Sequence, residues 1–137
     1  MARSGVSTKS ARSGRARPEA VRGPVADLER HLPAEWWREL FGVLYLRTDG
    51  DVVENPASTR ADVDALVHVA GLKPEHRILD LCCGQGRHAL ELSGRGFDLV
   101  TGIDQSAYLL GLARRRARQA GLPVRFKRGD ARVSTPE

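Results

Sequence analysis

Three carboxylates and two glycines occur at positions where they could bind a nucleoside. Asp80, Asp104 and Asp130 each end or follow a short apolar run, and Gly84 and Gly86 form the turn after the first of them. Glycines let such a turn bend and expose its amides, and an acidic side chain about 20 residues further on can accept hydrogen bonds from both ribose hydroxyls. Because parallel strands bring their carboxyl ends to one edge of a sheet, we expect the three aspartates to line one crevice.

The charge beside the glycine turn distinguishes two kinds of ligand. Gly84, Gly86 and Ala89 also satisfy the G-x-G-x-x-G/A pattern of dinucleotide-binding domains. Asp80, however, lies directly before the turn, where an ionised carboxylate would repel a pyrophosphate. The same carboxylate suits S-adenosylmethionine, which carries ammonium and sulfonium cations and no phosphate. These residues therefore favour S-adenosylmethionine as the cofactor, and an NAD-type oxidoreductase domain stays open as the alternative.

The elements that must position these residues are short apolar runs alternating with helical patterns, which is typical of βαβ units and a parallel sheet. We expect strands at residues 78–81, 99–103 and 124–127, and helices at about 87–93 and 106–120. The predicted fold is α/β, a Rossmann-like three-layer αβα domain with parallel strands, of which only the N-terminal half of the sheet is present. This half-sheet suggests a fragment of a longer protein, or a second chain that completes the sheet.

The first half of the chain is predicted to be a basic tail followed by helices. Residues 1–24 lack apolar periodicity and are expected to be disordered, whereas residues 25–70 carry helical patterns and lead into the cofactor-binding βαβαβ unit at 76–132. Residues 47–59 are expected to form a loop by composition. Ser58 or Thr59 could then cap a helix that runs to Ala70 and ends at Gly71. A single partial domain, residues 25–137, is therefore expected.

The positive charge of the chain is concentrated in the tail. Residues 1–24 hold six basic side chains and one acidic one, whereas residues 25–137 hold sixteen of each, so we expect no net field that would attract a nucleic acid. The cluster of arginines at Arg114, Arg115, Arg116 and Arg118 is interpreted as a solvated face near a helix C-terminus. A small molecule is therefore the expected acceptor or substrate.

The remaining composition indicates an ordinary protein of the cytoplasm. The sequence has neither a signal-peptide core nor an apolar run approaching the ~20 residues that span a bilayer, so we expect no membrane partner. Cys82 and Cys83 are adjacent, which suits neither an ordinary disulfide nor a metal site, and both are expected to be reduced and buried. No metal is predicted.

The segment LDLCCGQGRHALELSGRGFDLVTGIDQS, followed by RGDAR, resembles the class I S-adenosylmethionine-dependent methyltransferases, over about residues 76–132. The resemblance implies that the cofactor-binding residues are Asp80, Cys82, Gly84, Gly86, Asp104, Gln105, Asp130 and Ala131. The loop would support the methionine moiety, Asp104 the ribose and Asp130 the adenine amino group. The family often has glycine at the position of Cys82, and a cysteine leaves less room beside the cofactor.

By this resemblance the chain is expected to transfer a methyl group to a small-molecule acceptor, and a truncated, non-catalytic module that binds S-adenosylmethionine is a further alternative. Trp36, Trp37 and Tyr45 could form part of a substrate lid or simply pack on the domain. His88 could act as a base or as a packing residue at a helix start. No catalytic residue is predicted from the sequence.

Overall fold

The computed structural model describes residues 28–33 and 35–132. The chain divides into two units, residues 1–32 and 33–137. The described part of the first unit includes a short 3-10 helix, Leu28–His31. The predicted tail at residues 1–24 lies outside the described residues. Everything below concerns the second unit.

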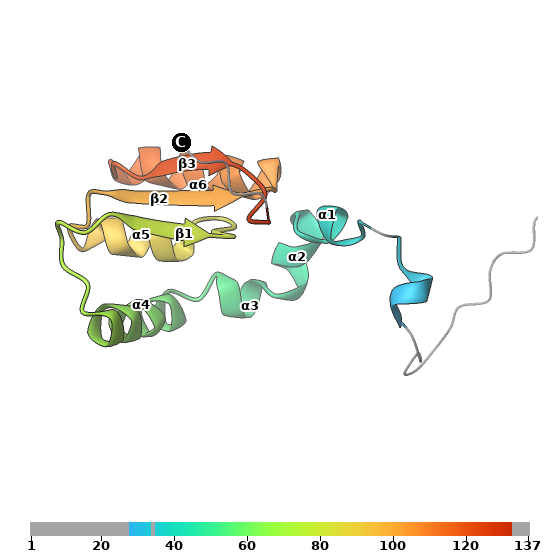
Figure 1. The fold of residues 1–137 in the computed structure, drawn as a ribbon, viewed down its shortest axis with the longest axis horizontal. Coiled ribbons are helices and arrows are strands. Elements are labelled where there is room, and N and C mark those ends of the chain that lie inside the picture. The colour runs from blue at the N-terminus through green and yellow to red at the C-terminus, as the bar shows by residue number, and fades with distance from the viewer. Residues whose placement is uncertain (1–27, 34, 133–137) are drawn as a thin grey trace, which may run out of the picture. The chain divides into compact units, whose positions relative to one another are not determined.

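A parallel sheet forms the centre of this unit (Figure 1). Its strands are β1 (Ile78–Leu81), β2 (Val100–Asp104) and β3 (Arg125–Arg128), in the order β1-β2-β3. The register pairs Leu81 with Ile103 and Asp104 with Arg128, so the three strands end at one edge. The parallel strands and the Rossmann-like α/β fold expected from the sequence are thereby confirmed, with bounds that differ by one residue in β2 and β3.

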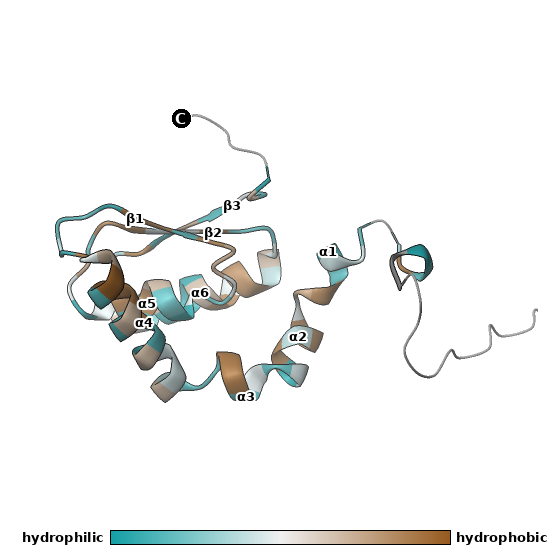
Figure 2. Ribbon diagram, turned by 60° about the horizontal axis from the view of Figure 1, so that its bottom comes forward, coloured by the Kyte–Doolittle hydropathy of each residue, from teal (hydrophilic) through white to brown (hydrophobic). Residues whose placement is uncertain are grey.

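Three helices cover one face of this sheet: α4 (Pro56–Ala70), α5 (Arg87–Gly94) and α6 (Ala107–Ala120) (Figure 2). The core lies between these helices and the strands, and its largest fully buried side chains are Leu109, Leu110, Val63 and Val100. On the opposite face of β1, Leu79 and Leu81 are 56% and 53% exposed. In the described part of the chain no helix combines the length and the hydrophobicity needed to cross a bilayer.

The boundaries of α6 follow from its capping residues. The Ser106 side chain accepts a hydrogen bond from the Leu109 amide at 3.2 Å, which satisfies one of the free donors of the first turn. Gly121 ends the helix with a φ of 66°, a left-handed conformation that costs glycine little. Gly71 ends α4 in the same way, with a φ of 57°, as expected.

The prediction of a loop at residues 47–59 was wrong. The segment contains the end of α2 (Val43–Thr48), all of α3 (Gly50–Val53) and the start of α4, and α1 (Trp37–Leu40) precedes it. Asn55, not Ser58 or Thr59, caps α4: its side chain accepts from the amides of Ala57 and Ser58 at 2.9 and 3.2 Å. Pro56 occupies the first turn, where its missing N–H costs nothing. The Asn55-Pro56 pair is a signal for the start of a helix, and the prediction from composition did not consider it.

Candidate functional site

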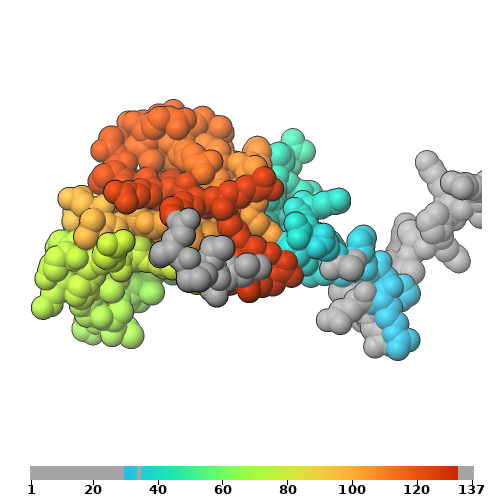
Figure 3. Space-filling model, turned by 45° about the horizontal axis from the view of Figure 1, so that its top comes forward, coloured from blue at the N-terminus to red at the C-terminus, as the bar shows by residue number. Residues whose placement is uncertain are grey.

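A cavity of about 370 Å³ opens at the carboxyl ends of the strands, within the ~300–1,000 Å³ typical of ligand pockets. One side comes from the loops that follow β1, β2 and β3, and the other from α1 and α2, which lie against these strand ends (Figure 3). The lining residues are Trp37, Phe41, Tyr45, Cys82, Gly84, Ile103, Asp104, Gln105, Leu109, Gly129, Asp130, Ala131 and Arg132. Most are apolar or aromatic, so the cavity suits a flat, largely uncharged group beside a few polar atoms.

Asp104, at the end of β2, is the carboxylate held most firmly in this cavity. It is 8% exposed. Its Oδ2 accepts from the Gly84 amide at 2.8 Å, and its Oδ1 accepts from the Ser106 amide at 2.7 Å. A carboxylate has about four acceptor positions, so each oxygen retains one for a ligand. The side chain is therefore already oriented to receive two further donors, such as two neighbouring hydroxyls.

The two glycines of the turn serve different purposes. Gly84 lines the cavity with a φ of +54°, and a Cβ there would have Leu109 Cδ1 as its nearest neighbour, at 3.8 Å. Gly86 does not line the cavity. A Cβ on Gly86 would lie 2.8 Å from Phe126 Cζ and 3.0 Å from the Ala113 side chain. Our expectation that both glycines make room for a ligand thus fails for Gly86, which is needed because the turn packs tightly on the core.

Asp80 also lies elsewhere than expected. Along β1 the side chains alternate, so that Asp80 is on the helix-covered face with Ile78 and is absent from the cavity lining. The Ala89 amide, in the first turn of α5, lowers the pKa of this carboxyl group. The expected single crevice lined by three aspartates is therefore wrong: Asp104 and Asp130 line it, and Asp80 supports the turn from behind.

Burial leaves Asp80 in an unusual electrostatic state. Its Oδ2 is buried and has no hydrogen-bond partner among the described residues. Desolvation raises the pKa of Asp80 above its ordinary value, an effect that His88 and the Ala89 amide partly offset and that the negative Asp104 reinforces. A cation bound near the turn would stabilise the ionised form of this carboxyl group.

The two cysteines have different environments. Cys83 is buried, which raises the pKa of its thiol to about 12, so it remains protonated. Cys82 is exposed and lines the cavity, contrary to the expectation that both are buried. Its φ of 59° is the only left-handed value at a non-glycine position in the described residues. Glycine adopts this conformation without strain, so Cys82 stands where the backbone favours glycine.

Asp130 is engaged by a neighbour that the sequence analysis did not consider. Both carboxylate oxygens accept from the Arg132 guanidinium, the shortest contact being 2.6 Å from Nη2 to Oδ2. This hydrogen bonding holds the pKa of Asp130 well below its usual range. The same guanidinium stacks over the Trp37 ring, with its carbon 4.4 Å from the ring centroid. Asp130 therefore faces the cavity as one part of an Asp130–Arg132–Trp37 cluster.

The remaining candidates divide between the cavity and its surroundings. Gln105 and Ala131 line the cavity, as do Trp37 and Tyr45 of the suggested lid, whereas Trp36 does not. His88 lies outside the cavity, with its Nε2 3.2 Å from Asp62 Oδ2, so it has no place as a base there. Among the described residues no group of three His, Cys, Asp or Glu side chains is close enough to hold a metal ion.

Sequence reasoning also missed Phe41, Ile103, Leu109, Gly129 and Arg132 of the lining. Ile103 and Leu109 follow from the motif itself, because they flank Asp104 on the strand and on the next helix. Phe41 lies in the break between α1 and α2, four residues before Tyr45, and the two rings make an edge contact with centroids 5.4 Å apart. Arg132 gave a weaker signal, an Asp-x-Arg pattern in which the Asp130 carboxylate accepts from both the backbone amide and the guanidinium of Arg132.

The parallel strands, the glycine turn and the buried carboxylate at the end of β2 are features typical of class I S-adenosylmethionine-dependent methyltransferases. Residues 78–137 match a family model described as "Methyltransferase domain".

Among the curated relatives, the chain is 38% identical over 84 residues to a 23S rRNA (uracil-C5)-methyltransferase of Thiobacillus denitrificans, covering 61% of this chain and 19% of that protein. It is 45% identical over 65 residues to 2-phytyl-1,4-naphtoquinone methyltransferase of Synechococcus elongatus, covering 43% and 27%. Among solved structures, the PH0226 protein of Pyrococcus horikoshii matches with a TM-score of 0.54 and 30% identity, over 68% of this chain and 45% of that one. The chain thus spans between 19% and 27% of these two curated relatives.

Proposed function

We propose that the chain binds S-adenosylmethionine in the strand-end cavity and takes part in methyl transfer to an acceptor. The observation that carries this proposal is Asp104, a buried carboxylate that lines the cavity and is fixed by two backbone amides. Such an arrangement can accept both hydroxyls of a ribose without reorganising. The methyltransferase family match supports the same cofactor.

The other lining residues fit the rest of this cofactor. Ile103 and Leu109 offer apolar surface for an adenine ring, and Asp130 with Ala131, also in the lining, would recognise its amino edge. Gly84 and Cys82 would border the methionine moiety, and Asp80 behind them would oppose its positive charge. When bound, the cofactor supplies an activated methyl group on a sulfonium for in-line displacement. The chain's own contribution is to bind and orient.

The structure gives a reason to prefer this cofactor over a dinucleotide. In the dinucleotide fingerprint the second glycine lets the backbone approach the pyrophosphate. Here that glycine, Gly86, is packed against Phe126 and Ala113 and does not reach the cavity. The first-turn amide of Ala89, which could otherwise serve a phosphate, acts on the Asp80 carboxyl group instead, and an ionised carboxylate there would repel a phosphate. An NAD-type oxidoreductase domain is therefore not favoured.

The methyl acceptor is a separate question. The names of the relatives include both an RNA and a quinone methyltransferase, so they do not select an acceptor class. The small-molecule acceptor expected from the sequence depended on the charge balance of residues 25–137, and the uneven distribution of those charges in the fold weakens that argument. A cofactor-binding module without catalysis would share the binding site and differ only in turnover.

Calorimetric titration with adenosylhomocysteine tests the proposal. Asp104→Ala should weaken binding at least about tenfold, because hydrogen bonds to a charged group contribute roughly 1.5–3 kcal/mol each. Asp98→Ala is the matched control: it removes the same group from an exposed position outside the cavity and should leave the affinity unchanged. Equal affinity in wild type and Asp104→Ala would contradict the proposal, and so would binding of NADH without a response to adenosylhomocysteine.

A further inference from the structure

In the second unit the basic and acidic side chains are unevenly distributed, although their numbers balance over residues 25–137. Residues 107–128, which form α6, β3 and their connection, contain seven basic side chains and no acidic one. On the other side of the helix layer, arginines are paired with acids: Arg87 with Asp62 at 2.8 Å, and Arg95 with Asp64 at 2.6 Å. Positive charge is therefore concentrated at the β3 side of the sheet.

Five of these seven basic side chains lie on or beside β3, and we call them the basic edge: Arg114, Arg118, Arg125, Lys127 and Arg128, all exposed. Of the other two, Arg116 is paired with Glu54 at 2.6 Å. Arg114 Nη2 donates to the Phe126 carbonyl oxygen at 2.8 Å, so this flank of α6 reaches β3. Arg118 lies one turn further along the same flank. In β3, Phe126 is buried while its neighbours on both sides are exposed. Because side chains alternate along a strand, Arg125 and Lys127 lie on the face opposite Phe126, whereas Arg114 and Arg118 come from α6 on the helix-covered face. The basic edge therefore flanks β3, the edge strand of the described sheet, on both faces.

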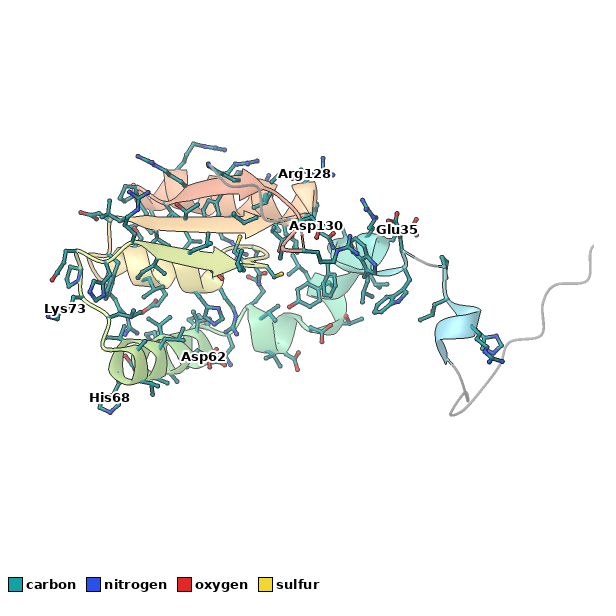
Figure 4. The ribbon with its side chains drawn as sticks, viewed as in Figure 1. Glu35, Asp62, His68, Lys73, Arg128 and Asp130 are labelled. Atoms are coloured by element: carbon teal, nitrogen blue, oxygen red, sulfur yellow. The ribbon has the colours of Figure 1, made fainter. Side chains whose placement is uncertain are left out.

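The basic edge leads to the cofactor cavity. Arg128 Nε donates to the carbonyl oxygen of Gln105, a residue of the cavity lining, at 3.1 Å. Beside it lies a second hollow of about 270 Å³, lined by Arg38, Gln105, Arg128, Gly129 and Asp130. The Asp130 carboxylate in this hollow is neutralised by Arg132, and Arg38 is paired with Glu35 at 2.8 Å. Figure 4 shows Arg128 and Asp130 at the same end of the sheet.

The basic edge is explained better by a bound ligand than by the alternative role of keeping an edge strand solvated and unpaired. Charged side chains on an edge strand deter pairing with other chains, but either sign serves that purpose. Among the described residues neither Arg118 nor Arg125 has a carboxylate within ion-pair distance. A run of like charges repels itself, and a bound polyanion would relieve that repulsion.

We propose that the basic edge binds the phosphate backbone of a single-stranded nucleic acid and directs it to the cofactor cavity. Exposed aromatic rings that could stack on bases occur in the same unit, at Tyr108 (44% exposed) and Trp36 (41%). An anionic membrane fits less well, because Tyr108 is the only one of the exposed large apolar side chains of the described chain that falls within residues 107–128. The claim that this nucleic acid carries the methyl acceptor rests on the proposed function. The claim that the basic edge binds it does not.

Fluorescence anisotropy of the full chain with a labelled oligouridylate tests the surface. Arg118→Gln/Arg125→Gln should weaken binding at least about fivefold at moderate salt. It should also lower the slope of log affinity against log salt by about 1.4, because each lost phosphate contact with a single strand removes about 0.7. The control, Lys73→Gln/Arg77→Gln, removes the same charge from exposed positions between α4 and β1 and should have less than about a twofold effect. Equal losses in both variants would overturn the proposal.

Binding measurements with other ligands distinguish a single-stranded nucleic acid from duplex DNA and from a membrane. Tighter binding of duplex DNA than of oligouridylate and oligothymidylate would overturn the single-strand assignment. Binding of phosphatidylserine vesicles in the absence of oligonucleotide binding would overturn it in favour of a membrane. Adenosylhomocysteine affinity, measured on the same variants, should not change, because neither Arg118 nor Arg125 lines the cavity. Failure of the proposed function would appear in that titration, whereas failure of this inference would appear in the anisotropy.

Discussion

The strand-end wall of the cavity and the wall formed by α1 and α2 are held by different interactions. The strand-end wall depends on backbone conformation: Gly84 and Cys82 are left-handed, and Asp104 is fixed by two amides. The helical wall depends on side chains, among them the Trp37 ring beneath the Arg132 guanidinium. Changes in the first wall should therefore alter folding and binding together, and changes in the second should alter the local charge with little loss of stability.

The largest effect is expected from adding a methyl group at Gly86. Gly86→Ala and Gly84→Ala both place a Cβ at a positive φ, at a cost of roughly 1–2 kcal/mol. Only at Gly86 would that Cβ clash, at 2.8 Å from Phe126 Cζ, which adds about 1–3 kcal/mol of overpacking. Urea unfolding should therefore show a larger loss for Gly86→Ala. Equal losses would mean that the turn does not pack on the core as described.

This contrast also shows how far the sequence could predict the molecule. The strands, α5 and α6, and the carboxylate at the end of β2 all follow from local patterns, because a βαβ unit is specified by short apolar runs and a glycine turn. The sequence analysis did not predict which face of the sheet Asp80 occupies, although the alternation of side chains along β1 gives this face once the buried side of the strand is known. The roles of Gly84 and Gly86 could not be separated either, because the packing of Gly86 on Phe126 is a contact across 40 positions of sequence.

The helical wall was less accessible to sequence reasoning. Trp37 and Tyr45 were noted as a lid or as packing residues, and only the contacts across the cavity place them in its lining. Arg132 was missed because it pairs with Asp130 and stacks on a ring 95 positions earlier in the chain. The basic edge was missed because net charge contains no information on where the charges lie.

A smaller, local effect is expected from Arg132→Gln. Losing the guanidinium should return the pKa of Asp130 from well below its usual range toward the ordinary carboxyl value of about 3.9. Because the folded pKa is depressed, the stabilisation by this ion pair is present above the ordinary pKa and is lost as the pH falls through the folded value. An NMR titration of the Asp130 carboxyl carbon measures the change.

Arg38→Gln is the matched control for that titration. Arg38 also lowers the pKa of Asp130, but through a weaker coulombic interaction than the hydrogen bonds from Arg132. Its removal should shift the titration less than removal of Arg132 does. A larger shift in Arg38→Gln would contradict the assignment of Asp130 to the Asp130–Arg132–Trp37 cluster.

The smallest effect is expected from Cys82→Gly. The substitution removes the left-handed strain at φ 59° but increases the freedom of the unfolded chain, so the free energy of unfolding should rise by no more than about 1 kcal/mol. Removing an exposed thiol from the cavity should also strengthen adenosylhomocysteine binding a few-fold, as read by calorimetry. Cys83→Ala, at the buried neighbour, should lower stability instead. Weaker cofactor binding in Cys82→Gly would show that the thiol contacts the ligand.

A crystal structure of the chain with adenosylhomocysteine tests the account most directly. We predict that the two ribose hydroxyls donate to Asp104 Oδ1 and Oδ2 while these oxygens keep their bonds from the Ser106 and Gly84 amides. The adenine should then lie between Ile103 and Leu109. A nucleoside bound outside this cavity, or a ribose turned away from Asp104, would contradict the account.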